Sequence, residues 1–397
     1  MTPPSSSTQT PQRGTGRGIG IRTAAGSDER AHGQLHVYDG DGKGKSQAAL
    51  GVVLRTIGLG ICEQKRTRVL LLRFLKGPGR SYDEDAAIEA LQQGFPHRID
   101  QVRTGRGDFF TAEEASRFDH QEAERGWDIA RGAIASNLYS VVVLDEINPV
   151  LDLGLLPTDE VCRILAAKPH GMEVICTGRG APPELVQLAD LQSEMRAHRR
   201  LEPGAETEAS GERGLDGIEI YTGEGKGKST SALGKGLQAI GRGISQDKSH
   251  RVLILQWLKG GSGYTEDAAI AALRESYPHL VDHLRSGRDA IVWRGQQQPI
   301  DYVEAERAWE IARAAIASGL YKTVILDELN PTVDLELLPV EPIVQTLLRK
   351  PAETEVIITG RCKSRPAYFD LATVHSEMVC HKHYAERGVD LKRGVDY

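Results

Sequence analysis

Two short stretches of the chain combine lysine, serine and glycine in the same order. Residues 37–46 read VYDGDGKGKS, and residues 220–229 read IYTGEGKGKS. In each copy an apolar run precedes the glycines and a run rich in Ala, Leu and Gly follows, which predicts a strand, a turn and a helix. Glycines allow backbone N–H groups to close around phosphate oxygens, and the helix N-terminus adds partial positive charge. Each copy is therefore predicted to form a phosphate-binding loop, or P-loop.

Each loop offers ligands for a nucleotide and for a magnesium ion. Lys45 and Lys228 are expected to neutralise the outer phosphates in catalysis, and Ser46 and Ser229 to bind Mg²⁺. The other residues expected to contact the phosphates are Gly40, Gly42, Lys43, Gly44, Gly223, Gly225, Lys226 and Gly227. A glycine-rich turn that arose by chance would explain one copy, but two copies in the same context favour nucleotide binding.

The spacing of the loops differs from the usual pattern. Asp39 and Thr222 stand where a glycine is usual, and each copy carries an extra lysine, Lys43 or Lys226. A carboxylate beside a phosphate is unfavourable, so the second loop is expected to be the more active one.

An Asp-Glu pair ends an apolar run in each half of the chain. Asp145 and Glu146 follow the run 140–144, and Asp327 and Glu328 hold the equivalent place in the second copy. Ligands of parallel α/β sheets bind at the carboxyl ends of the strands. These carboxylates are therefore expected to reach Mg²⁺ directly or through water, with Glu146 and Glu328 serving catalysis. A helix cap or a solvated turn is the alternative.

Arg179 and Arg361 end the next strand of each copy and are expected at the same edge. The guanidinium fork suits phosphate, although a surface ion pair is the alternative. The sequence contains no Ser-His-Asp or Cys-His set that predicts a protein nucleophile. This fits a reaction in which the substrate itself attacks while the protein positions groups and neutralises charge. Trp127 and Trp309 lie on apolar helical stripes and are expected in the core.

Strands and helices alternate along each copy. Strands are predicted at 34–38, 68–74, 99–102, 140–144 and 173–177, and helices after the loop and at 83–91, 121–135 and 158–167. The same order returns in the second copy. This alternation predicts an α/β fold with two tandem P-loop NTPase-like (RecA-like) domains, each a mainly parallel sheet with helices on both faces.

Composition suggests the domain limits. Residues 1–32 are rich in Ser, Thr, Pro, Gly and Arg, which predicts a disordered tail, with an organelle transit peptide as the alternative. The first domain is expected at 33–200, a Gly- and Glu-rich linker at 201–214, and the second domain at 215–397.

The overall composition limits the possible partners and compartments. The net charge is -6 and the pI about 6.1, which argues against nucleic acid as the main partner. Five cysteines without a Cys-x-x-Cys pair suggest neither a disulfide framework nor a zinc site. No apolar run has transmembrane length and no secretory signal is apparent, so a cytoplasmic protein without membrane contact is expected.

Several motifs together resemble the ATP:corrinoid adenosyltransferases of the P-loop type. The shared pattern Gly-x-Gly-Lys-Gly-Lys-Ser resembles the loop of that family. Further matches in the second copy are 256–260 (QWLKG), 326–329 (LDEL), 357–361 (IITGR), 376–378 (SEM) and 394–397 (GVDY). The resemblance as a whole extends over nearly all of both copies.

The resemblance implies transfer of the 5′-deoxyadenosyl group of ATP to the Co(I) of cobalamin or cobyrinic acid a,c-diamide, with release of triphosphate, in cobalamin biosynthesis. It implies ATP and Mg²⁺ as cofactors, a corrinoid as co-substrate, and triphosphate bound by Lys45, Lys228 and the loop amides. Family members are homodimers of one such domain, so this chain is expected to be a monomeric, intramolecular pseudo-dimer.

Two alternatives remain open at this point. Each copy departs from the family in one segment. Where the family has Gly-Phe-x-Trp, this chain has 105–108 (GRGD) in the first copy and 287–290 (GRDA) in the second. A diverged P-loop ATPase or nucleotide-binding regulatory protein without corrinoid activity is therefore one alternative. A non-catalytic scaffold is the other.

Overall fold

The computed structural model describes residues 33–64, 66–77, 79, 81–108, 110–200 and 217–397. The expected tail at 1–32 and linker at 201–214 lie outside these residues. We call residues 33–200 the first half and residues 217–397 the second half.

The first half contains alternating strands and helices. Its strands are β1 (Leu35–Asp39), β2 (Val69–Arg73), β3 (Ile99–Arg103), β4 (Val141–Asp145), β5 (Glu173–Thr177) and β6 (Leu191–Arg200). Its helices are α1 (Lys45–Cys62), α2 (Glu84–Gly94), α3 (Arg117–Ser136), α4 (Ile147–Asp152), α5 (Thr158–Ala166) and α6 (Pro183–Leu188), with the 3₁₀ turn η1 (Ala112–Glu114).

The second half repeats this order. Its strands are β7 (Ile218–Thr222), β8 (Arg251–Gln256), β9 (Val281–Arg285), β10 (Tyr321–Asp327), β11 (Glu355–Thr359) and β12 (Val374–Lys382). Its helices are α7 (Lys228–Ser245), α8 (Glu266–Ser276), α9 (Pro299–Ser318), α10 (Leu329–Asp334) and α11 (Val340–Leu348), and its 3₁₀ turns are η2 (Ala367–Leu371) and η3 (Tyr384–Arg387).

The twelve strands of the described residues form one sheet in the order β3-β2-β4-β5-β1-β6-β12-β7-β11-β10-β8-β9. Neighbouring strands run parallel except at the centre, where β6 and β12 pair antiparallel and join the halves. The predicted α/β class with two tandem, mainly parallel domains is confirmed. The merging of the two sheets into one was not predicted.

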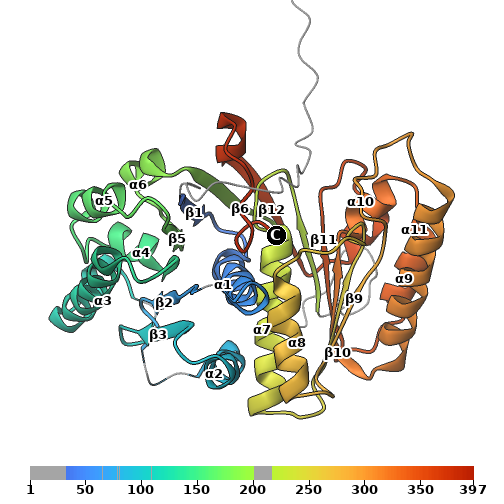
Figure 1. Ribbon diagram of the computed structural model, residues 1–397, viewed down its shortest axis with the longest axis horizontal. Coiled ribbons are helices and arrows are strands. Elements are labelled where there is room, and N and C mark those ends of the chain that lie inside the picture. The colour runs from blue at the N-terminus through green and yellow to red at the C-terminus, as the bar shows by residue number, and fades with distance from the viewer. Residues whose placement is uncertain (1–32, 65, 78, 80, 109, 201–216) are drawn as a thin grey trace, which may run out of the picture.

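Four helices form the layer between the halves. Helices α1, α2, α7 and α8 pack on one another, and the sheet curves around them (Figure 1). The apolar side chains of both halves form one continuous core there. Gly51 lets α1 approach α7 closely, because a Cβ atom at Gly51 would lie 2.0 Å from the carbonyl oxygen of Thr230.

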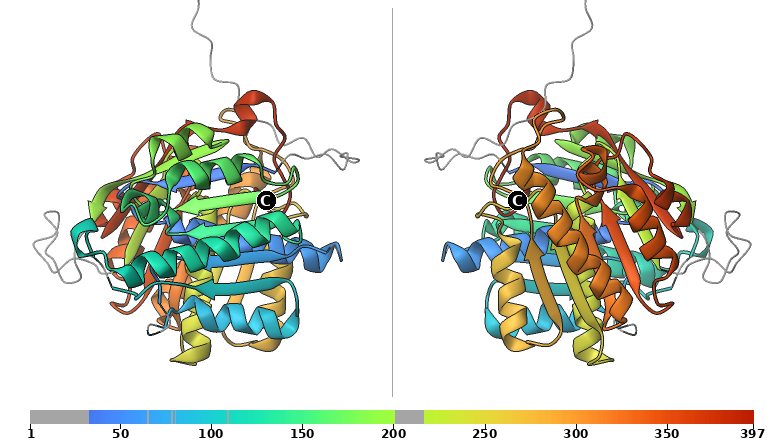
Figure 2. Two further views of the ribbon diagram at one scale, coloured as in Figure 1. Left: turned by 90° about the vertical axis from the view of Figure 1, so that its left-hand side faces the viewer. Right: turned by 90° about the vertical axis from the view of Figure 1, so that its right-hand side faces the viewer.

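The remaining helices cover the opposite face of the sheet. Helices α3 to α6 cover the first half and α9 to α11 the second, as the side views show (Figure 2). Each of these layers has its own core, and Trp127 and Trp309 are buried in them as predicted. The carboxyl ends of the central strands point toward the two P-loops.

Candidate functional site

The two P-loops connect β1 to α1 and β7 to α7. Gly44 and Gly227 stand at the helix N-caps with φ of 115° and 127°, a region that side chains disfavour. This conformation turns the chain so that the helices begin at Lys45 and Lys228. The first-turn amides of both helices therefore face the loop interior, where an anion would bind.

The side chains of the two P-loop lysines are bonded within their own loops. Lys45 Nζ donates to the carbonyl oxygens of Gly40 at 2.7 Å and Gly42 at 2.6 Å, and Lys228 Nζ to that of Gly225 at 2.6 Å. Burial disfavours the ammonium form and lowers the pKa of both lysines to about 8. An anionic ligand would reverse this effect by compensating the buried charge.

The aspartates of the two Asp-Glu pairs are engaged by lysines. Asp145 forms an ion pair with Lys76 and accepts a hydrogen bond from Thr177, and Asp327 does so with Lys259 and Thr359. Burial alone would raise the pKa of both carboxyls, but the neighbouring ammonium groups lower it. These aspartates therefore hold Lys76 and Lys259 in place.

The glutamates of the pairs lie beside the P-loops. Ser229 Oγ lies 3.4 Å from Glu328 Oε1. Glu146 and Glu328 both have φ of 63°, the left-handed region, and they begin the short helices α4 and α10. Such strained non-glycine residues cluster at functional sites. Burial, followed by the charge of Asp145, raises the pKa of the Glu146 carboxyl.

The extra lysines of the loops form ion pairs with carboxylates. Lys43 pairs with Glu219 of the second half, with 3.7 Å between Nζ and Oε1. Lys226 forms an ion pair with Asp396 and donates to Tyr384 Oη at 3.1 Å. Their predicted role as phosphate contacts thus competes with these ion pairs.

The predicted arginines lie at the mouths of the loops. Arg179 Nη2 donates to the Asp41 carbonyl oxygen at 3.4 Å, and Arg361 pairs with Glu224 at 3.0 Å. The side chains of Arg361 and Glu224 are exposed, so the pair is weak and can open toward a phosphate.

A cavity of about 320 Å³ opens at the second loop. This size is within the range of small-molecule sites. It brings together predicted residues of the second half, and its lining is Arg55, Glu224, Gly225, Lys226, Gly227, Lys228, Ser229, Thr230, Lys259, Tyr264, Glu328, Arg361, His383, Leu391, Asp396 and Tyr397. The predicted residues Gly223 and Asp327 are not part of the lining, although Asp327 pairs with Lys259, which is.

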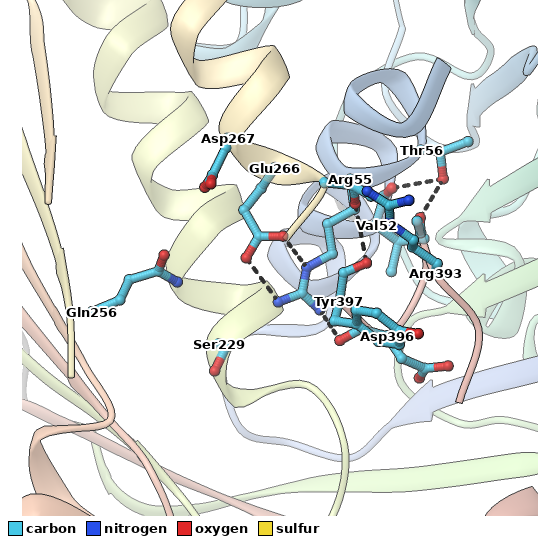
Figure 3. A network of polar contacts seen from close by, with 12 residues as sticks. Val52, Arg55, Thr56, Ser229, Gln256, Glu266, Asp267, Arg393, Asp396 and Tyr397 are labelled. Atoms are coloured by element: carbon cyan, nitrogen blue, oxygen red, sulfur yellow. Dashed lines mark hydrogen bonds and ion pairs between the residues drawn. The ribbon is translucent and has the colours of Figure 1, made fainter. Parts of the chain in front are cut away.

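Sequence reasoning missed several of these residues. Lys259 and its counterpart Lys76 could have been found, because a Lys-Gly pair follows the same strand in both copies. Arg55 comes from the first half, as Figure 3 shows, and no local pattern assigns it to the second loop.

The described ranges contain neither a cluster of metal-binding side chains nor a helix that could cross a membrane. These residues contain no group of three or more His, Cys, Asp or Glu side chains placed to hold a metal ion. None of their helices has the length and apolar character needed to cross a bilayer.

Comparison with known proteins shows the family. The family model described as ATP:corrinoid adenosyltransferase BtuR/CobO/CobP matches residues 31–216 and again residues 212–397. The chain is 71% identical over 384 residues to the uncharacterized protein all2391 of Nostoc sp. strain PCC 7120. The aligned residues cover 96% of this chain and 100% of that relative.

Relatives named as corrinoid adenosyltransferases match one copy of the repeat. The corrinoid adenosyltransferase of Pseudomonas aeruginosa is 34% identical over 174 residues, 44% of this chain and 79% of the relative. That of Escherichia coli K12 is 33% identical over 190 residues, 48% of this chain and 89% of the relative. This chain, with two copies in tandem, belongs to the ATP:corrinoid adenosyltransferase family.

Proposed function

We propose that this chain is a corrinoid adenosyltransferase that uses ATP and Mg²⁺ and serves cobalamin biosynthesis. The observation that carries the proposal is the cavity of the second half. In it the P-loop, Glu328 and Lys259 converge within a chain whose two halves both match the family. Cobyrinic acid a,c-diamide or cobalamin, with cobalt as Co(I), is the expected acceptor.

The triphosphate of ATP is expected to lie along the P-loop. Lys228 and the amides at the start of α7 would bind its oxygens, and Arg361 would close on it from the mouth. Lys259, which Asp327 holds in place, adds a second ammonium group to the same cavity. In the first half Lys45, Lys76, Asp145 and Arg179 hold the equivalent places.

The oxygen ligands beside the loop fit Mg²⁺. The ion prefers oxygen, keeps several waters and binds through one or two protein groups together with substrate phosphates. Ser229 and Glu328 supply a hydroxyl and a carboxylate 3.4 Å apart, and Ser46 and Glu146 are their counterparts. When bound, the ion would neutralise charge on the triphosphate.

The reaction needs no nucleophile from the protein. The electron pair of Co(I) attacks C5′ of ATP, the Co–C bond forms, and the C5′–O bond breaks to release triphosphate. The leaving group carries several negative charges, so Lys228, Lys259 and the loop amides would stabilise it as charge develops. The chain's contribution is therefore positioning and charge neutralisation.

Product analysis tests this proposal. The purified chain is incubated with MgATP and a chemically reduced corrinoid, and the products are separated. We expect triphosphate and an adenosylated corrinoid in equal amounts, and no reaction in the Lys45→Met/Lys228→Met double variant. ADP and phosphate as products would instead show a diverged ATPase. We further propose that the chain acts in the cytoplasm and as a monomer. The mass of the purified chain from light scattering would check the monomeric state.

A further inference from the structure

The last residues of the chain return to the first half. After β12, residues 384–397 pack against α1, where Thr56 Oγ1 lies 2.9 Å from the carbonyl oxygens of both Gly394 and Val52 and can donate its one hydrogen to either. Arg393 forms an ion pair with Glu63 at the end of the same helix. We call residues 384–397 the C-terminal segment. Its anchors on α1 belong to the first half.

The C-terminal segment also forms a wall of the second cavity. Asp396 and Tyr397 line the cavity beside the second loop. The Asp396 carboxylate binds Lys226 of that loop and accepts a hydrogen bond from Tyr384. Burial alone would raise the pKa of Asp396, but the charge of Lys226 and the hydrogen bonds from Lys226 and Tyr384 lower it to about 2. The segment is thereby fixed to both halves.

Arg55 of α1 joins the two sides of this cavity. Its side chain is buried, with Nε and Nη2 donating to the Glu266 carboxylate at 3.2 and 3.3 Å. Its Nη1 donates to the Asp396 carbonyl oxygen at 2.6 Å. Figure 3 shows the guanidinium between Glu266 at the start of α8 and the C-terminal segment. One side chain of the first half thus positions two elements of the second.

The equivalent place in the first half is built differently. Glu84, which begins α2 as Glu266 begins α8, pairs with Arg73 of its own β2 strand, with Nη1 and Oε1 2.8 Å apart. The residue of α7 that matches Arg55 is Gln238, which donates to Glu84 at 3.1 Å. In the second half the residue that matches Arg73 is Gln256.

Arginine and glutamine therefore occupy opposite positions in the two halves. The helix position holds Arg55 in the first half and glutamine in the second, and the strand position holds Arg73 in the first half and glutamine in the second. The first site draws its arginine from its own strand, and the second draws its arginine from the other half. Each buried glutamate keeps one guanidinium partner, but only Arg55 also reaches the C-terminal segment.

We propose that the second nucleotide site is assembled in trans, with Arg55 of the first half as a positioning residue that holds the C-terminal segment over the loop. The role of the first half in the second site is then separate from any turnover at its own loop. This inference rests on the proposed function only in taking MgATP as the ligand.

The proposal predicts an effect confined to one site. Arg55 lies ten residues beyond Lys45 in α1, which places it about 15 Å along the helix from the first loop. Replacing Arg55 should therefore weaken the second site and spare the first. A general loss of stability would affect both sites alike.

The test measures MgATP affinity by calorimetry in two backgrounds. Lys45→Met leaves the second site to be measured, and Lys228→Met leaves the first. We expect Arg55→Gln to weaken MgATP binding about tenfold or more in the Lys45→Met background, because an organised cavity wall is lost. Its effect in the Lys228→Met background should be less than about twofold.

Arg73→Gln is the matched control, because it removes a buried guanidinium from the equivalent glutamate. In the Lys45→Met background it should leave the affinity of the second site unchanged. Thr56→Val removes the hydroxyl whose hydrogen Gly394 of the C-terminal segment shares with Val52, and it leaves no unpaired charge. This variant decides the matter if Arg55→Gln fails to fold. We expect a loss of about threefold at the second site alone.

Two results would overturn the proposal: unchanged affinity of the second site in both Arg55→Gln and Thr56→Val, or equal losses at the two sites. These binding results do not depend on the corrinoid. ADP as the reaction product would therefore contradict the proposed function and leave the assembly of the site intact.

Discussion

The hydroxyl of Ser229 lies 3.4 Å from Oε1 of Glu328, although about a hundred residues separate them in the chain. Ser229 belongs to the first turn of α7, and Glu328 directly follows β10. The fold thus places a hydroxyl at the start of α7 beside a carboxylate at the end of β10. We expect a magnesium ion bound to a nucleotide to use both groups, because Mg²⁺ prefers oxygen ligands.

Replacement of this carboxylate should weaken Mg²⁺ binding. We expect Glu328→Gln to raise the Mg²⁺ concentration for half-maximal turnover at least tenfold, because the amide lacks the negative charge of the carboxylate. Titration of activity with Mg²⁺ at saturating ATP measures the effect, and EDTA should abolish turnover in the unchanged chain. Glu336→Gln, at an exposed surface position, is the control. A normal Mg²⁺ requirement in Glu328→Gln would show that Glu328 is not a ligand.

The parallel strands and their helices could be predicted because their signals are local. The run 68–74 is apolar throughout, as in a strand covered on both faces, and it contains β2. Strands β6 and β12 were missed, since residues such as Glu194, Arg196 and His198 give them a polar face. Their pairing depends on a partner in the other half. No local pattern carries that information.

Helix α1 shows the same limit. Its residues form one apolar stripe at helical spacing, Leu50, Val53, Leu54 and Ile57. In the structure every residue from Ala48 to Gly58 is buried. The additional burial comes from α7 and α8, which cover the side away from the sheet. The position of Arg55 in the second cavity follows from this packing and could not be read from residues near it. The loop residues could be predicted because glycine, lysine and serine act there through adjacent positions.

Nucleotide affinity should fall at alkaline pH. The pKa of Lys45 and of Lys228 is about 8, below the usual 10.5, and a triphosphate favours the ammonium form. As the pH rises through 8 the free protein loses these protons, so ATP affinity should fall by up to about tenfold per pH unit for each lysine. Lys228→Arg remains charged and should flatten the profile in a Lys45→Met background. A pH-independent affinity between pH 7 and 9.5 would contradict this expectation.

The same lowered pKa has an effect on folding. Between pH 8 and 10.5 the unfolded chain binds more protons at these lysines than the folded chain does. The contribution of Lys45 and Lys228 to the free energy of unfolding should therefore rise with pH in this window. Urea unfolding at pH 8 and pH 10, compared with the Lys45→Met/Lys228→Met variant, isolates that contribution. A contribution that falls with pH would have the opposite sign from the one expected.

Proteolysis should separate the chain into halves that stay together. The composition of residues 201–214 predicts a protease-sensitive linker, whereas the β6–β12 pairing and the shared helix layer hold the halves. Limited trypsin digestion should give two fragments on a denaturing gel that elute as one species on gel filtration. Cleavage mainly within 121–177 would contradict the predicted domain limits. Fragments that separate without denaturant would show that the interface is weaker than its burial implies.

The two sites should be unequal because their loops begin differently. Asp39 ends β1 where Thr222 ends β7, and the Oδ1 atom of Asp39 is buried without a hydrogen-bond partner among the described residues. A carboxylate ~4–5 Å from a phosphate costs about 1–4 kcal/mol in partly screened surroundings. We therefore expect Lys228→Met to abolish turnover and Lys45→Met to leave a substantial part of it. Steady-state kinetics of the two variants measure the difference.

Exchange of the two residues tests the cause of this inequality. Asp39→Thr should strengthen MgATP binding by the first site, measured in the Lys228→Met background, roughly tenfold or more, because it removes the repulsion. Thr222→Asp should weaken the second site, in the Lys45→Met background, by a similar factor. Equal losses of turnover in Lys45→Met and Lys228→Met would instead mean two equivalent or strictly coupled sites. If Asp39→Thr weakened the first site, Asp39 would be a ligand, for instance through Mg²⁺, and the carboxylate would attract the nucleotide complex rather than repel it.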